Sequence, residues 1–231
     1  MTEHNCPMCI NRNFDIHKKQ TLSKLDRSRK GSIDSKIIDL VDEINRNSNF
    51  ATTSSCSGRV MLFSSSKNSA KKNCKWLWTS HDYLTTSEHL IDAVKSSYKM
   101  GDVGEISDLT LKFEPIILHV SCRNLNAAKR LQAAANQCGL RNSGLTFGTS
   151  GRITLAVRST ISLEIPIVIN GSLLVNDNYI RLLAGIVDEK FRLNDILIKK
   201  FMNEFRTRFR LDIMAAKDVA LTQNDSETNF D

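Results

Sequence analysis

The sequence predicts an α/β fold of mixed α+β character, in which two halves place helices on mixed sheets and a long C-terminal helix follows. Three observations predict it. Strand-like and helix-like apolar patterns are interleaved without forming a regular strand–helix–strand series. The tripeptide Ser-Gly-Arg occurs at 57–59 and at 150–152, each time after a helical pattern, which indicates two halves. No GxGxxG loop follows a strand, which argues against a Rossmann-like site.

The first half begins with a helix over about 34–47, where four apolar residues recur at helical spacing. These residues are Ile37, Leu40, Val41 and Ile44. The polar stretch that follows, ATTSSCSGRV at 51–60, is expected to contain a turn at 57–59. The apolar RVMLF at 59–63 is typical of a strand.

The middle of the chain continues with a strand, a helix and an extended segment. CKWLWTS at 74–80 predicts the strand. The helix is expected over about 86–99, where apolar residues again keep helical spacing, and Gly101 follows its end. The segment 109–122 is rich in apolar residues and is expected to be extended, but broken or bent at Pro115.

The second half has a helix over about 124–138, with Asn124 placed to cap it. A β-hairpin is expected over 143–159, because GTSG supplies the glycines of a reversal. An edge-like strand, LEIPIVI, and a further turn and strand come next. The helical pattern from about 176 to 214 then places three aromatic residues on one side, where we expect core or partner contacts rather than base stacking. They are Phe201, Phe205 and Phe209.

Length and composition describe an ordinary globular chain of 231 residues. We expect a flexible tail at 1–13, a single domain at 14–214 and a disordered tail at 215–231. No apolar run could span a bilayer and no signal-peptide pattern opens the chain, so we expect a cytoplasmic protein with reduced cysteines. Cys6 and Cys9 form a lone CxxC without a second ligand pair, so we expect no metal site.

Basic residues exceed acidic ones, 32 against 25, which gives a net charge of +7. This charge suits an anionic partner such as RNA. The stretch from His17 to Lys30 is especially basic. Two interpretations remain open for it: a solvated helix face, or an arm that contacts phosphates.

The densest polar cluster is TTSSCSGR at 52–59, and the common P-loop, zinc-protease and hydrolase motifs are absent. Its hydroxyls and the N–H groups around Gly58 can form a donor surface for a carboxylate or phosphate, and Arg59 adds a bidentate fork. The candidates for binding there are Ser54, Ser55, Ser57 and Arg59. Cys56 has no evident base, so we expect it to pack rather than to act as a nucleophile.

Further candidates lie later in the chain. Lys112 and Glu114 share one face of a predicted strand, either lining a cleft or forming a cross-strand charge pair. His119 lies between apolar residues and is by default a half-buried histidine with its hydrogen bonds satisfied. Arginine also stands near serine in LRNSG and AVRST, a combination that suits an anionic ligand. These residues are Arg141, Ser143, Arg158 and Ser159.

Five ordered segments resemble the tRNA wybutosine-synthesising protein 3 family. They are KLDRSRKGSID (24–34), TTSSCSGR (52–59), LKFEPIILHVSCR (111–123), GLRNSG (139–144) and LAVRSTISLEIPI (155–167). The resemblance covers roughly residues 14–205. Ile116 and Leu140 stand where the family usually has aromatic residues. Both replacements are apolar, so they concern local packing more than chemistry.

The resemblance implies an activity. The family transfers a methyl group from S-adenosylmethionine to N4 of the tricyclic base precursor at position 37 of phenylalanine tRNA, in the anticodon loop. The implied fold is mixed α/β and distinct from Rossmann-like methyltransferases. We therefore expect S-adenosylmethionine as the cofactor and phenylalanine tRNA as the partner. The alternatives are a non-catalytic tRNA-binding or scaffold protein of the same pathway, or a hydrolase that uses Cys56 and His119.

Roles for the candidate residues follow from this chemistry. The cofactor or a substrate carboxylate is expected at Ser54, Ser55, Ser57 and Arg59. Either Glu114 or His119 accepts the proton that the nitrogen loses. The tRNA is expected to meet Lys112, Arg141, Ser143, Arg158 and Ser159. The sequence leaves open which motif holds the cofactor.

Overall fold

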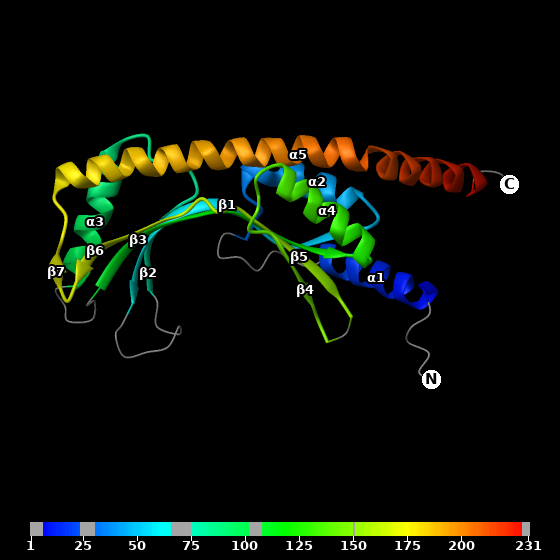
Figure 1. Cartoon of the computed structure of the whole chain (residues 1–231), viewed down its shortest axis with the longest axis horizontal. Coiled ribbons are helices and arrows are strands. Elements are labelled where there is room, and N and C mark those ends of the chain that lie inside the picture. Colours follow the sequence, from blue (N-terminus) through cyan, green and yellow to red (C-terminus); the bar gives the residue numbers. More distant parts are fainter. Residues whose placement is uncertain (1–6, 24–30, 66–74, 102–107, 150, 228–231) are drawn as a thin grey trace. The chain divides into compact units, whose positions relative to one another are not determined.

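The computed structural model describes residues 7–23, 31–65, 75–101, 108–149 and 151–227 (Figure 1). The elements are α1 Pro7–Leu22, the short 3-10 helix η2 Ser35–Ile37, α2 Ile38–Arg46, β1 Phe50–Ser65, β2 Lys75–Ser80, α3 Ser87–Gly101, β3 Asp108–Cys122, α4 Leu125–Gln137, β4 Gly144–Phe147, β5 Ile153–Arg158, β6 Leu163–Ile169, β7 Ser172–Leu173 and α5 Asp177–Glu227. The strands follow the order β2-β1-β3-β5-β4, and β6 joins β3 and β7. This is the mixed α/β fold that the sequence predicts.

The chain divides into two compact units. Unit 1 comprises Met1–Cys56, Ile116–Ser159 and Leu197–Asp231, and unit 2 comprises Ser57–Pro115 and Thr160–Ile196. The chain therefore passes from one unit to the other within β1, within β3, between β5 and β6, and within α5.

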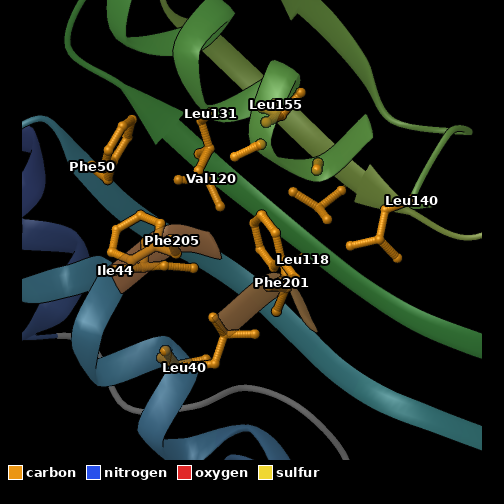
Figure 2. Packing of buried hydrophobic residues seen from close by; sticks show 14 of the residues in the cluster. Leu40, Ile44, Phe50, Leu118, Val120, Leu131, Leu140, Leu155, Phe201 and Phe205 are labelled. Carbon is orange, nitrogen blue, oxygen red and sulfur yellow. The ribbon is translucent and has the colours of Figure 1, made fainter. Parts of the chain in front are cut away.

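Unit 1 has a core of aliphatic side chains around four phenylalanines. Figure 2 shows side chains of α2, β1, β3, α4, β5 and α5 converging: Leu40, Ile44, Phe50, Leu118, Val120, Leu131, Leu155, Phe201 and Phe205. Phe50 makes edge-on contacts with Phe205 and Phe209, with ring centroids 5.9 and 5.1 Å apart. Of the core or partner contacts expected for the phenylalanines of the last helix, the core contacts are confirmed, since all three are fully buried.

Unit 2 has its own core, formed by β1, β3 and β6 with α3 and the first part of α5. Phe113 and Phe191 meet edge-on at its centre, with ring centroids 4.9 Å apart. The pairing of β1 with β2 contains a bulge, because Leu62 faces Trp78 while Phe63 faces Trp76. The extra residue turns the two tryptophans to opposite faces. Trp78 packs against the core, whereas Trp76 is 38% exposed.

Two features of β1 and β3 differ from expectation. The predicted turn at 57–59 is wrong, because the whole polar stretch lies inside β1. In the second Ser-Gly-Arg, Gly151 and Arg152 do lie at the hairpin turn between β4 and β5, whereas Ser150 lies outside the described residues, so the two copies are not equivalent. Of the break or bend expected at Pro115, the break is wrong, since β3 continues through this residue. Pro115 falls between the segments that pair with β6 and β5, where its missing N–H is not needed.

The ends of the chain are more helical than expected. α1 begins at Pro7, within the segment expected to be a tail, and α5 continues to Glu227. Cys9 lies in α1, whereas Cys6 lies outside the described residues. The predicted cap of α4 is confirmed, because the Asn124 side chain accepts a hydrogen bond from the Ala127 N–H at 2.9 Å.

Candidate functional site

The predicted site residues divide between the two units. Seven belong to unit 1, namely Ser54, Ser55, His119, Arg141, Ser143, Arg158 and Ser159. Four belong to unit 2, namely Ser57, Arg59, Lys112 and Glu114. The structure gathers most of each set into one group of neighbouring residues. We call the group in unit 1 the His119 cluster (Ser54, His119, Arg141 and Arg158) and the group in unit 2 the Glu114 cluster (Arg59, Lys112 and Glu114).

Strand pairing assembles the His119 cluster. His119 lies on β3 between two strands, and Thr53 of β1 donates from its hydroxyl to the His119 carbonyl at 3.1 Å. The Ser54 hydroxyl lies 2.7 Å from His119 Nδ1, and Nη2 of Arg158 lies 3.4 Å from His119 Nε2. Burial, and secondly the charge of Arg158, lower the pKa of His119. Both ring nitrogens are thus engaged, and the surroundings favour the neutral imidazole.

Two arginines give the His119 cluster its charge. Arg141 and Arg158 are exposed and meet through an isolated backbone bridge. Among the described residues neither forms an ion pair with a carboxylate. This arrangement suits an anionic ligand, which guanidinium groups bind strongly.

The other predicted serines of unit 1 are Ser55, Ser143 and Ser159. The Ser143 hydroxyl donates to the Leu140 carbonyl at 2.6 Å and accepts from the Arg158 N–H at 3.0 Å. It therefore fixes the turn that leads into β4. Ser159 is buried and Ser55 is half-buried.

The Glu114 cluster is a network of opposite charges. Nε and Nη2 of Arg59 both donate to Glu114 Oε2, at 3.0 and 2.7 Å. Lys112 Nζ lies 3.7 Å from the other oxygen of Glu114 and 3.4 Å from Glu164 Oε2. Because Lys112 pairs with Glu164 across β3 and β6, the interpretation as a cross-strand charge pair is confirmed. The sequence did not reveal the Arg59–Glu114 bond, which joins residues 55 positions apart.

Aromatic rings flank the cations of the Glu114 cluster. The guanidinium carbon of Arg59 lies 4.2 Å from the ring centre of Trp76, and Lys112 Nζ lies 5.9 Å from that of Phe63. The bulge in β2 directs Trp76 to this face. Such cation–π contacts hold the cations in place beside the carboxylates.

Ser57 does not join the open face. It is buried, and its carbonyl accepts a hydrogen bond from Asn194 Nδ2 at 2.7 Å. Asn194 is itself fully buried on α5. The adjoining Gly58 has φ +113°, a backbone conformation that favours glycine. The expected ligand surface is therefore interrupted here by packing.

The contacts of Lys18 differ from those of a solvated helix face or a phosphate-contacting arm, the two interpretations of the basic stretch from His17 to Lys30. Its ammonium donates to the Asn47 carbonyl at 2.5 Å, so it points into unit 1. Burial, with a smaller contribution from the charge of Arg123, lowers the pKa of Lys18 to about 8, while Asp15 opposes the shift. Residues 24–30 of the expected phosphate-contacting arm lie outside the described residues.

The pKa of Lys18 predicts a pH dependence of stability. Between about pH 8 and the usual lysine value near 10.5, the unfolded chain keeps a proton on Lys18 that the folded chain has lost. The free energy of unfolding should therefore rise with pH across this window. The Lys18→Met variant should not show this rise. Urea unfolding of wild type and variant at about pH 7.5 and about pH 9.5 measures the difference. If the free energy of unfolding changes with pH equally in wild type and variant, Lys18 does not have the lowered pKa.

Similarity to known proteins extends over both units. The family model Methyltransferase TYW3 matches residues 16–207. The human tRNA wybutosine-synthesizing protein 3 homolog is 42% identical over 193 residues, which are 82% of this chain and 71% of that protein. A tRNA wybutosine-synthesizing protein 2/3/4 from Arabidopsis thaliana is 35% identical over 78% of this chain and 20% of that protein.

Solved structures share the fold. The PH1069 protein from Pyrococcus horikoshii has a TM-score of 0.74 and 27% identity, covering 85% of this chain and 97% of its own. A hypothetical protein from Aeropyrum pernix has a TM-score of 0.64 and 25% identity, covering 76% of this chain and 98% of its own. Within the part of the chain that the structure describes, no helix has the length and apolar character of a membrane span.

The matched region contains every residue of the His119 and Glu114 clusters. It also follows the chain through both units. This protein belongs to the Methyltransferase TYW3 family.

Proposed function

We propose that this methyltransferase takes a methyl group from S-adenosylmethionine and places it on N4 of the tricyclic base precursor at position 37 of phenylalanine tRNA. The observation that carries the proposal is the family match over residues 16–207. The names of the relatives, tRNA wybutosine-synthesizing protein 3 homologs, indicate the pathway. The net charge of +7 agrees with an RNA substrate.

We assign the two clusters to different ligands because their charged groups differ in sign. The methyl donor carries a carboxylate, an ammonium group and a sulfonium, so its site needs groups of both signs. The Glu114 cluster offers both, since Arg59 and Lys112 alternate with carboxylates of Glu114 and Glu164. We therefore assign the methyl donor to unit 2, with Arg59 toward its carboxylate. A tRNA phosphate is anionic only, and it suits the cationic His119 cluster of unit 1.

The reaction is a displacement at carbon. The nitrogen forms a bond to the methyl carbon, the carbon–sulfur bond breaks with its electron pair on sulfur, and the nitrogen loses a proton. Most of the acceleration in such a reaction can come from holding the two reactants in line. Both candidate proton acceptors are engaged, but the single acceptor nitrogen of His119 faces Arg158, whereas the Glu114 carboxylate, paired with Arg59 and Lys112, keeps further lone pairs. We therefore assign the proton to Glu114.

A methyl-transfer assay tests this function. The protein is incubated with radiolabelled S-adenosylmethionine and tRNA from a strain that is blocked at the unmethylated precursor. We expect label in phenylalanine tRNA, in a single nucleoside. The control is tRNA from an unblocked strain, whose position 37 already carries the methyl group and should stay unlabelled. Tight binding of the blocked tRNA without label would instead support the scaffold alternative.

A further inference from the structure

The hydrogen bonds around His119 have a fixed direction. A neutral imidazole has one nitrogen that donates and one that accepts. A guanidinium can only donate, so Nε2 of His119 must accept from Arg158 at 3.4 Å. Nδ1 then carries the hydrogen and donates to the Ser54 oxygen at 2.7 Å. The single hydroxyl hydrogen of Ser54 is consequently turned away from the ring.

The surroundings of the ring support this tautomer. The ring contacts Ser54 of β1, and the residue opposite His119 on strand β5 is Ala156. The charged group beside the ring is Arg158, which disfavours a second positive charge on the imidazole. The pKa of His119 is lowered accordingly by burial and by that charge.

The face that bears Ser54 has room for a ligand. Ser54 is exposed. His119 faces Ala156, and Ala156 faces Gly144 on β4, so side chains become smaller along this row. A Cβ atom built on Gly144 would meet no atom within 4 Å. A group bound beside His119 can therefore reach the Ser54 hydroxyl and the guanidinium of Arg158.

We propose that Ser54, Arg158 and Arg141 form an oxyanion site and that His119 is its positioning residue. The ring holds the Ser54 oxygen as an acceptor, so the Ser54 hydrogen is presented to the ligand. The ligand is an oxyanion, and a tRNA phosphate fits better than the carboxylate of the methyl donor. The reason is that the described residues of this cluster include no carboxylate for the adjoining ammonium group. The choice of these two sources rests on the proposed function.

Four variants of the full chain test the site by direct binding measurements. An alanine at Ser54 or at His119 should weaken binding of the oxyanion ligand by about 10- to 50-fold, the effect of a charge-assisted hydrogen bond. The double variant should lose no more than Ser54→Ala alone, because the two residues act through one hydroxyl. His119→Asn should stay within about threefold of wild type, since its amide N–H can replace Nδ1–H.

Two ligands distinguish the source of the oxyanion. Filter binding of precursor tRNA should show the losses, and titration calorimetry with S-adenosylhomocysteine, which keeps the carboxylate, should not. The opposite pattern would assign the site to the carboxylate. Both measurements are independent of methyl transfer, so a failed labelling assay with these losses intact would count against the proposed function alone.

Other outcomes would overturn the oxyanion site itself. If Ser54→Ala leaves both affinities unchanged, Ser54 donates to neither ligand. If His119→Asn loses as much affinity as His119→Ala while melting normally, the ring does not act through Nδ1–H. If His119→Ala fails to fold, the other two single variants still test the site. It requires a loss of about 10- to 50-fold for Ser54→Ala and of at most about threefold for His119→Asn.

Discussion

Replacing Gly58 with alanine should lower the free energy of unfolding by about 3 kcal/mol. Gly58 has φ +113° in the middle of β1, a conformation that other residues adopt only under strain. The added Cβ would lie 3.0 Å from Asn194 Nδ2, 3.2 Å from the Glu114 carbonyl oxygen and 3.4 Å from the Pro115 carbonyl carbon. Two of these neighbours are backbone atoms and the third belongs to a fully buried side chain. None can move away at low cost.

Gly185 provides the matched control. It lies in α5 in the same unit, and an added Cβ there would meet no atom within 4 Å. Gly185→Ala should therefore raise the free energy of unfolding by up to about 1 kcal/mol, the helix propensity difference. Urea unfolding of both variants measures the contrast. Equal behaviour of the two would mean that β1 does not hold the left-handed backbone at Gly58.

Reversing the charges of Arg141 and Arg158 together should weaken tRNA binding about 100-fold at about 0.1 M salt. The prediction rests on the assignment of tRNA phosphates to the His119 cluster. Each lost phosphate contact should also reduce the slope of log affinity against log salt by about 1. Filter binding of precursor tRNA across a salt series gives both quantities for the Arg141→Glu, Arg158→Glu variant.

The control is a second pair of arginines with the same change in charge. Arg181 and Arg192 lie on α5 and already pair with acidic residues, Glu88 at 3.3 Å and Glu189 at 2.6 Å. The Arg181→Glu, Arg192→Glu variant should lose far less affinity and keep the salt slope of the wild type. Equal losses in the two double variants would indicate a general effect of net charge and no site at Arg141 and Arg158.

The sequence predicts the parts of the fold that depend on local patterns. Helices α2, α3 and α4, the β4–β5 hairpin and the burial of Phe201 follow from spacing within one element. The polar part of β1 could not be found this way, because serine and threonine runs are typical of loops. Here a hydroxyl is satisfied by a distant partner, as Thr53 is by the His119 carbonyl on β3. Such partners exist only once the strands have paired.

The candidate site was predictable as a set of residues but not as an arrangement. Hydroxyl and arginine density marked Ser54 and Arg158, because those residue types bind anions. The direction of the His119 hydrogen bonds depends on β1 and β5 lying on either side of β3, which local sequence does not encode. The division of the candidates between two units has the same origin, since the chain crosses between the units within β1 and β3.

The bulge turns Trp78 toward the core and Trp76 toward Arg59. The positions of these two tryptophans determine what optical spectroscopy of this protein can detect. The chain has two tryptophans and three tyrosines, and all five lie in unit 2. The aromatic residues of unit 1 are phenylalanines alone, which contribute little above 280 nm. Tryptophan fluorescence therefore reports the melting of unit 2 only, through one indole in the core and another against Arg59. Comparing its transition with that of the far-ultraviolet circular dichroism would reveal whether the two units unfold together.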